Sequence, residues 1–350
     1  MNISGREVGP GCPVYVIAEV GVNHDGSPGR AVELVDAAAD AGADAVKFQL
    51  FRADLLMSAA SRLAAYQKGA GESDPLSMLR RLELGVDQMR PAVERARRRG
   101  VHAIVTVFSE SLVAQAEMLG WDAYKTASPD VIHAPLLSAL EHTGRPIILS
   151  TGAATLDEVL RAVGWLSGAC ARLGVLQCVS SYPVADESAA LGGIVGLRGA
   201  LPGLPIGYSD HTTRADTGGK AVTLGACILE KHLTYDRRAK GPDHAASLDP
   251  DGFREYITLA RRGVAVAEDD PMAGPPLKRV LDCERDVRAV SRQSVCSTRA
   301  LVEGTVLSAA DLTVKRPGWG IEPFHLGTLI GRRVLRGVGA DTPLSWEDLG

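Results

Sequence analysis

Two histidines and a glutamate stand close together between residues 205 and 236, in a pattern that could hold a metal ion. This segment is predicted to form a strand (PIGYSDH), a helical crossover and a second strand (CILEKHLT). Side chains alternate along a strand, so Ser209 shares a face with His211, and Glu230 shares a face with His232. Because neighbouring parallel strands lie about 4.8 Å apart, the two imidazoles could reach one divalent ion. Either histidine alone could be an ordinary core residue, but the set favours a metal site with a catalytic glutamate.

Two lysines, Lys47 and Lys125, are expected to point into the same interior. A buried ammonium group costs several kcal/mol unless it is paired, and a nearby carboxylate could pair with each lysine. With Ser128, Ser150 and Ser209 beside them, an anionic ligand explains the lysines better, because phosphate and carboxylate accept charge-assisted hydrogen bonds. The sequence therefore predicts a site for a small anion beside the metal site.

Eight short apolar runs would position these groups. Helical patterns separate the runs, and a capping box (Thr155–Glu158) marks the start of one helix. Alternating strands and helices imply parallel strands with right-handed crossovers, and eight such units fit a closed (β/α)₈ TIM barrel. The runs are residues 14–21, 43–50, 102–109, 122–128, 146–152, 174–181, 205–211 and 227–234.

Polar residues gather at the C-terminal ends of these runs, whereas the runs begin with apolar or small residues. Active sites of such barrels lie at that end of the strands. The polar set therefore predicts one site at the mouth of the barrel. Its members are Glu19, Asn23, His24, Asp25, Lys47, Gln49, Thr106, Ser109, Lys125, Ser128, Ser150, Thr151, Ser180, Tyr182, Ser209, His211, Glu230 and His232.

The pattern changes after the eighth run. Residues 1–268 are predicted to form the catalytic barrel, with a long loop between residues 51 and 101 on the side of the active site. Residues 269–286 are rich in proline and charge, which is typical of a linker. Residues 287–350 have short β-branched runs and frequent glycines, which favour a small β-rich second domain docked on another surface.

Composition narrows the class of protein. The 350 residues carry a formal charge of −4 without visible segregation, which does not suggest a nucleic-acid or membrane-surface partner. The six cysteines form no CxxC pair and no zinc spacing, as expected for reduced thiols in a cytoplasm. We see no signal peptide and no apolar run of the ~20 residues that a membrane helix needs. We therefore expect a cytoplasmic, soluble enzyme.

Nine segments in the same order carry a family resemblance: IAEVGVNHDG, AVKFQ, TVFS, AYKTAS, ILSTG, QCVSSYP, IGYSDHT, ILEKH and KGPDHAASLDP. Together they closely resemble the sialic acid synthase (N-acetylneuraminate synthase) family, and VKRPGWGI resembles that family's SAF, or antifreeze-like, domain. The resemblance covers nearly the whole chain. It implies a transferase that forms a C–C bond between phosphoenolpyruvate and an open-chain N-acylated hexosamine such as N-acetylmannosamine. The products would be a nine-carbon 3-deoxy-ulosonic acid and phosphate.

The resemblance also implies roles for single residues. Glu19 matches an acid that contacts the reacting end of the sugar, and Glu230 matches the base that directs water. Residue types alone leave Mn²⁺, Mg²⁺, Zn²⁺ and Fe²⁺ open; the resemblance favours Mn²⁺, with Mg²⁺ as the alternative, on His211 and His232, and with Gln49 nearby through water. The residues that match phosphoenolpyruvate ligands are Lys47, Thr106, Lys125, Ser128, Ser150 and Ser209, with Ser180 grouped beside them.

The acceptor end of the site is implied in the same way. Tyr182 and Asp243 match residues that line the sugar site. Arg316 matches an arginine that the C-terminal domain delivers into the barrel of the partner subunit, which implies a domain-swapped homodimer. Three departures, Ser180 for asparagine, Gln177 for histidine and Asp130 for glutamate, leave the acceptor open.

Several alternatives remain at this point. N-acetylmannosamine, unsubstituted mannose and a 2,4-diacetamido-6-deoxy hexose, which would give a sialic, a deaminated and a legionaminic-type acid, are all compatible with the sequence. A Schiff-base aldolase that uses Lys125, a synthase for a sugar phosphate and a non-catalytic regulator are alternatives from other classes. The set of His211, His232 and Glu230 argues against the aldolase, which needs no metal, and against the regulator.

Overall fold

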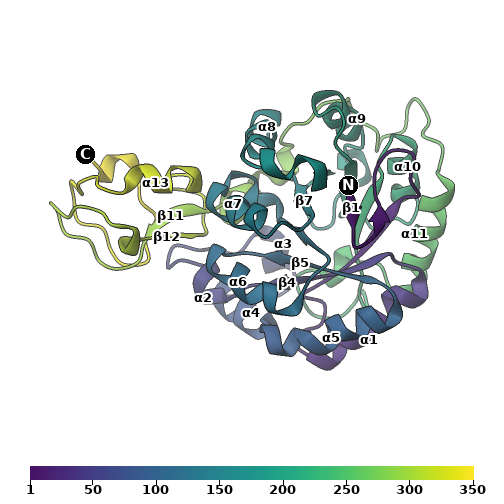
Figure 1. The fold of residues 1–350 in the computed structure, drawn as a ribbon, viewed down its shortest axis with the longest axis horizontal. Coiled ribbons are helices and arrows are strands. Elements are labelled where there is room, and N and C mark those ends of the chain that lie inside the picture. Colours follow the sequence, from purple (N-terminus) through teal and green to yellow (C-terminus); the bar gives the residue numbers. More distant parts are fainter.

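Eight parallel strands close into a barrel in the computed structural model, which describes residues 1–350 (Figure 1). Each strand pairs with the next one along the chain, and the last pairs with the first, so that Glu230 lies opposite Ile17 and His232 opposite Glu19. The predicted TIM barrel and all eight predicted strands are confirmed. The strands are β3 (Tyr15–Gly21), β4 (Ala45–Leu50), β5 (His102–Val107), β6 (Ala123–Lys125), β7 (Ile147–Ser150), β8 (Leu173–Cys178), β9 (Ile206–Asp210) and β10 (Ile228–His232).

Helices surround the barrel, and their termini follow the sequence signals. Thr155 caps the helix that follows β7 by accepting a hydrogen bond from the Glu158 amide, as the capping box predicts. None of the helices is both long and apolar enough to span a bilayer. The helices of the barrel layer are α1 (Pro28–Ala41), α5 (Val86–Arg99), α6 (Val113–Ala116), α7 (Ala134–His142), α8 (Leu156–Trp165), α9 (Gly192–Ala200), α10 (Thr217–Thr223) and α11 (Pro250–Arg262).

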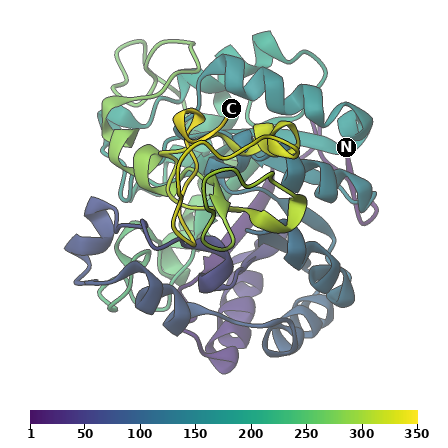
Figure 2. The same cartoon turned by 90° about the vertical axis from the view of Figure 1, so that its left-hand side faces the viewer.

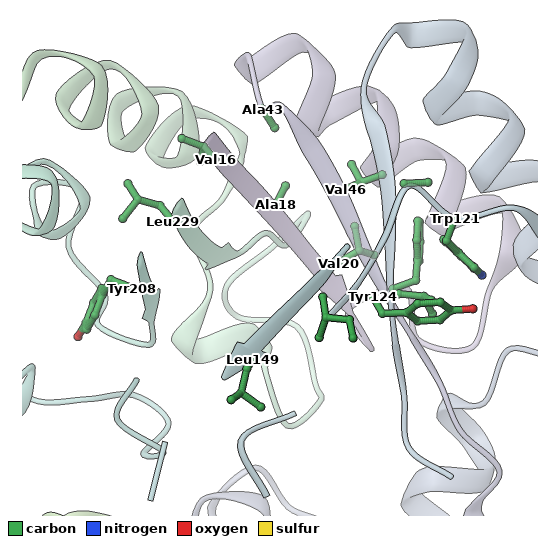
Figure 3. Packing of buried hydrophobic residues seen from close by; sticks show 14 of the residues in the cluster. Val16, Ala18, Val20, Ala43, Val46, Trp121, Tyr124, Leu149, Tyr208 and Leu229 are labelled. Atoms are coloured by element: carbon green, nitrogen blue, oxygen red, sulfur yellow. The ribbon is translucent and has the colours of Figure 1, made fainter. Parts of the chain in front are cut away.

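Alternation along the strands separates the core from the site. On β3, Val16, Ala18 and Val20 face outward into the core between strands and helices, part of which is shown in Figure 3. Ile17 faces inward and packs in a smaller apolar cluster at the amino end of the barrel, which the hairpin of β1 (Asn2–Ile3) and β2 (Arg6–Glu7) covers. Glu19 also faces inward but sits at the carboxyl end. The interior is therefore apolar at one end and polar at the other.

The long segment between β4 and β5 is more regular than the loop that the sequence predicts. It contains α2 (Ala53–Leu56), α3 (Ala65–Gly69) and α4 (Pro75–Leu82). Their apolar side chains pack with Phe51 and Phe108 in a separate small core beside the barrel mouth. This core forms one wall of the cavity described below.

The segment predicted as a linker is packed against the barrel. The backbone N–H groups of Leu191 and Gly192 donate to Met272 and Ala273, and Glu284 is fully buried. The C-terminal domain follows, with a ten-residue apolar core of its own. Figure 2, a view from the side on which this domain projects in Figure 1, shows the domain in front of the barrel. α12 (Arg285–Ser291) ends the connecting segment, and the elements of the domain are β11 (Ser294–Ser297), β12 (Leu312–Lys315) and α13 (Leu326–Leu329).

Candidate active site

Four buried charges alternate in sign across the mouth of the barrel. The Nζ atom of Lys47 lies 2.9 Å from Glu19 Oε2 and 3.8 Å from Glu230 Oε1, and the Nζ atom of Lys125 lies 3.1 Å from Glu230 Oε1. Lys47 also donates a hydrogen bond of 2.9 Å to Thr106 Oγ1. All four charged side chains are no more than 5 % exposed. The predicted convergence of the two lysines is therefore correct, and each ammonium group has a carboxylate neighbour.

The pKa values of the two glutamates are shifted in opposite directions. Burial raises the pKa of Glu19, and the attraction of Lys47 only partly offsets this effect. Burial also acts on Glu230, but the charges of Lys125 and Lys47 outweigh it and lower the pKa of that carboxyl. A pair of carboxyl groups whose pKa values are pushed apart suits one proton donor and one proton acceptor. Of the two, Glu230 has the lowered pKa and is the one suited to accept a proton.

Hydroxyl groups and a close backbone turn lie beside Lys125. Ser128 Oγ donates to Ser150 Oγ at 3.0 Å and accepts from the N–H of Gly152 at 2.9 Å. A Cβ atom on Gly152 would lie 2.2 Å from Ser180 Oγ, so only glycine allows this approach. We call Ser128, Ser150, Gly152 and Ser180 the serine cradle. Hydroxyl and N–H donors next to an ammonium group are suited to a phosphate or carboxylate.

His211 and His232 face each other, with ring centroids 5.5 Å apart. Nδ1 of His211 lies 2.8 Å from the carbonyl oxygen of Val179, which fixes the tautomer and leaves Nε2 free to bind an ion. Nδ1 of His232 is buried without a hydrogen-bond partner, 3.7 Å from Asp243 Oδ2. These features fit a divalent ion. No cluster of three His, Cys, Asp or Glu side chains surrounds the pair, so an ion would take its other ligands from water or substrate.

The charged residues, the serines of the cradle and the two histidines line one cavity with an empty volume of about 930 Å³. The ring of Tyr182 packs on His211, with centroids 4.2 Å apart, and burial raises the pKa of Asp243 to about 6. The amide of Gln49 donates to Glu19 at 2.6 Å. Every residue singled out for a role lines this cavity: Glu19, Lys47, Gln49, Thr106, Lys125, Ser128, Ser150, Ser180, Tyr182, Ser209, His211, Glu230, His232, Asp243 and Arg316. Their roles stay predictions.

The rest of the polar set has structural contacts. The side-chain amide of Asn23 donates to the carbonyl of Leu233, and the hydroxyl of Thr151 donates to that of Leu176. Nδ1 of His24 accepts from the N–H of Gly26. Asn23, His24, Asp25, Ser109 and Thr151 do not line the cavity.

Arg316 reaches the cavity of its own chain. Its N–H donates to the carbonyl of Leu56 at 2.9 Å, and its carbonyl accepts from the N–H of Ser58 at 3.1 Å. Its guanidinium carbon lies 5.7 Å from the ring centroid of Phe108. The resemblance implies delivery from a partner subunit, but one chain is sufficient for this contact. The homodimer stays a prediction.

Sequence reasoning missed other residues at the site. Tyr66, on α3, lines the cavity and packs on Tyr182, with centroids 4.9 Å apart. The Cys178 thiol lies 3.6 Å from Ser128 Oγ and 3.8 Å from His211 Nδ1. The apolar wall consists of Val22, Phe51, Leu56, Met78, Leu79, Leu82 and Phe108. A single tyrosine or cysteine has no periodic signal, and most of the apolar residues fall in the segment that was predicted as a loop.

Comparisons with known proteins agree with this arrangement. The chain matches the NeuB family over residues 34–269 and the SAF domain over residues 292–350. It is 35% identical to the N,N'-diacetyllegionaminic acid synthase of Legionella pneumophila, over 96% of this chain and 94% of that protein. It is 32% identical to the human N-acetylneuraminate-9-phosphate synthase, over 98% and 94% of the two chains.

A solved structure extends the comparison to the whole chain. The crystal structure of the spore coat polysaccharide biosynthesis protein spsE from Bacillus subtilis superposes with a TM-score of 0.86 at 32% identity, covering 100% of this chain and 99% of that one. A match of this extent includes the C-terminal domain as well as the barrel. With its barrel, its SAF domain and relatives that make sialic and legionaminic acids, the chain belongs to the NeuB family of sugar-acid synthases.

Proposed function

We propose that this protein condenses phosphoenolpyruvate, an open-chain N-acylated hexosamine and water into a nine-carbon 3-deoxy-ulosonic acid and inorganic phosphate. The observation that carries the proposal is the convergence of two lysines, the serines of the cradle, two histidines and Glu230 in one cavity. Phosphoenolpyruvate carries a phosphate and a carboxylate, and the lysines with the serine hydroxyl groups offer hydrogen bonds to both. The names of the relatives support the product class.

Each group of residues in the cavity is assigned one part of the reaction. C3 of phosphoenolpyruvate adds to the aldehyde carbon of the sugar, and the positive charge that develops at C2 is captured by water. Glu230 lies between the two lysines and accepts the proton of that water. Lys47 and Lys125 offset the negative charge of the phosphate until it leaves the tetrahedral intermediate. A divalent ion held by His211 and His232, Mn²⁺ in the simplest case, would supply Lewis-acid polarisation of the aldehyde oxygen.

The cavity favours an acceptor with methyl groups and without phosphate. Its permanent cations are Lys47, Lys125 and Arg316. The two lysines are engaged by glutamates and are assigned to phosphoenolpyruvate, so a phosphate on the acceptor would have to rely on Arg316 alone. The apolar wall would accommodate the methyl groups of N-acetyl substituents or of a 6-deoxy sugar. N-acetylmannosamine and a 2,4-diacetamido-6-deoxy hexose both fit this description, and the Legionella relative supports the second as an alternative.

A Schiff-base aldolase is disfavoured by the position of Lys125. An imine mechanism needs a neutral amine, but Lys125 Nζ lies at ion-pair distance from Glu230, 3.1 Å. The pair fits an ammonium group that binds an anion.

The experiment is an assay of phosphate release from phosphoenolpyruvate with Mn²⁺, using N-acetylmannosamine, mannose, a 2,4-diacetamido-6-deoxy hexose and N-acetylmannosamine 6-phosphate as acceptors. We expect release with one of the unphosphorylated N-acetylated sugars. Glu230→Gln should lower kcat by about 10²–10⁴-fold, the usual contribution of a general base, and leave phosphoenolpyruvate binding largely intact. Glu33→Gln, at an exposed position on α1, is the control. If none of the four acceptors supported phosphate release, the proposal would be refuted. Full activity of Glu230→Gln would show that this residue is not the base.

A further inference from the structure

A short segment outside the barrel holds the two loops that form the serine cradle. This segment, which we call the latch, comprises residues 281–292 and includes α12. Two of its charged residues are buried: Glu284 is 0 % exposed and Arg292 is 5 % exposed. Buried charges in a connecting segment are costly unless they are paired and hydrogen-bonded, so their contacts indicate what the segment does.

The latch makes hydrogen bonds to both the N–H and the carbonyl oxygen of one residue, Ala153, in the loop after β7. Ala153 follows Gly152 of the serine cradle and has a φ of 50°, in the left-handed region. Such a conformation is unfavourable for an alanine and persists only where the surroundings fix it. The N–H of Ala153 donates to Glu284 Oε1 at 2.5 Å, and its carbonyl accepts from Arg288 and, at 2.8 Å, from Arg292. The latch therefore fixes the backbone that places the Gly152 N–H.

Glu284 also connects this loop to the next one. The same oxygen, Oε1, accepts from the N–H of Ser180 at 2.7 Å, while Oε2 accepts from the N–H of Leu281 at 2.8 Å. Ser180 follows β8 and lines the cavity. One carboxylate oxygen thus ties the loop after β7 to the loop after β8, directly behind the serine cradle.

Glu158 balances the arginines of the latch. It lies 2.7 Å from Arg288 and 3.2 Å from Arg292 and belongs to α8, the helix that begins after the loop of Ala153. Burial opposes the ionisation of Glu158, but the hydrogen bonds from Arg288 and the charge of Arg292 outweigh it and lower its pKa to about 2. The arginines are thereby held in place on the carbonyl of Ala153.

We propose that Glu284 is a positioning residue for phosphate binding, which acts by fixing the loops of Gly152 and Ser180 so that the serine cradle is formed before the anion arrives. The inference rests on the proposed function, because it takes the cradle as the site of the phosphate of phosphoenolpyruvate. Glu284 does not itself line the cavity and accepts hydrogen bonds from backbone N–H groups, so its effect passes through the loops. Preformed donors bind an anion more tightly than donors that must be ordered on binding.

The test measures the affinity of the full-length protein for inorganic phosphate, by calorimetric titration, together with KM for phosphoenolpyruvate, KM for the acceptor and kcat. In Glu284→Ala, we expect the Kd of phosphate and the KM of phosphoenolpyruvate to rise by about tenfold, or about 1.4 kcal/mol. KM for the acceptor should change by less than about threefold. Asp282→Ala is the matched control, since Asp282 is 89% exposed in the same segment and pairs only with Arg285; it should match the wild type.

Glu284→Gln provides a milder variant if Glu284→Ala does not fold. Its amide oxygen can still accept from Ala153 and Ser180, but its NH₂ group would face the N–H of Leu281, so we expect a smaller loss of phosphate affinity, about threefold. A Kd for phosphate within twofold of the wild type in a folded Glu284 variant would overturn the inference, even if the variant were less thermostable. An equal rise in both KM values would also overturn it. If the wild type bound phosphate but turned over no phosphoenolpyruvate, the proposed function would be wrong. The phosphate titration of the Glu284 variants would still decide whether Glu284 positions the phosphate site.

Discussion

Asp130 should make the stability of this protein fall as pH rises. Its carboxyl is fully buried after β6, with Oδ2 accepting from the N–H of Ala127 at 3.0 Å and Oδ1 without any partner. Burial raises its pKa from 3.8 to about 7, and the charge of Arg316 only partly offsets this effect. In the unfolded chain the carboxyl ionises near 3.8, whereas in the folded protein it keeps its proton until about pH 7. The stability that the proton provides is complete below pH 3.8 and is lost as pH rises through 7.

The size of this effect follows from the two pKa values. At about 1.4 kcal/mol per pH unit, the loss reaches about 4 kcal/mol above pH 7. Asp130→Asn never ionises, and its amide oxygen can still accept from the N–H of Ala127. Its NH₂ group costs about 1–3 kcal/mol if it finds no partner, but this cost does not depend on pH. The free energy of unfolding of the variant, relative to wild type, should therefore increase by a few kcal/mol between pH 4 and pH 8.

The assay compares the unfolding midpoints of wild type and Asp130→Asn across that pH range. All other titrating groups are common to both proteins, so the difference between the two curves isolates this carboxyl. Asp282→Asn, at an exposed position, should show a constant difference from wild type. A constant difference for Asp130→Asn as well would refute the reasoning, because it would mean that the buried carboxyl is ionised throughout.

Three further predictions follow from the contacts of the site. If Arg316 serves the cavity of its own chain, as its position in the single chain allows, an equimolar mixture of Glu230→Gln and Arg316→Ala should have no more activity than the two variants separately; recovery of about a quarter of the wild-type activity would instead indicate the predicted exchange between partner subunits in a swapped dimer. Phe324→Ala removes the contacts of that ring with Trp165 (5.6 Å) and Arg161 (4.7 Å), so limited proteolysis should release the C-terminal domain faster and KM for the acceptor should rise; unchanged proteolysis would show that this contact does not hold the domain. A chelator should abolish phosphate release and Mn²⁺ should restore it, while borohydride added during turnover should leave Lys125 unmodified; trapping at that lysine would support the aldolase instead.

The barrel could be predicted from the sequence because its signals are local. Each strand is a short apolar run, and a cap such as Thr155 lies within three residues of the group that it binds. Alternation along a strand also predicts that Glu19 and Lys47 point into the mouth of the barrel. The region of α2, α3 and α4 was predicted as a loop, because its helices are short and are stabilised by packing on Phe51 and Phe108 rather than by their own periodicity.

Other parts of the site could not be predicted because the sequence does not show which distant residues meet. Glu158 reads as one half of a capping box, but it is also the partner of Arg288 and Arg292, more than a hundred residues later. Glu284 reads as one charge in a polar linker, yet it is buried against loops that follow two different strands. In both cases the residue type was visible and its partner was not.

The charge balance of the cavity explains why a metal and an anion would be bound together here. Before any ligand enters, Lys47, Lys125 and Arg316 face Glu19, Glu230 and Asp243, so the positive and negative groups are equal in number. Phosphoenolpyruvate would add negative charge to this balanced set, and each lysine already has a carboxylate neighbour. A divalent ion would restore the balance, and so would a proton on Asp243, whose pKa burial raises to about 6. If the divalent ion improves the binding of phosphoenolpyruvate, then phosphoenolpyruvate improves the binding of the ion by the same factor. The metal site and the anion site are therefore expected to fill together rather than independently.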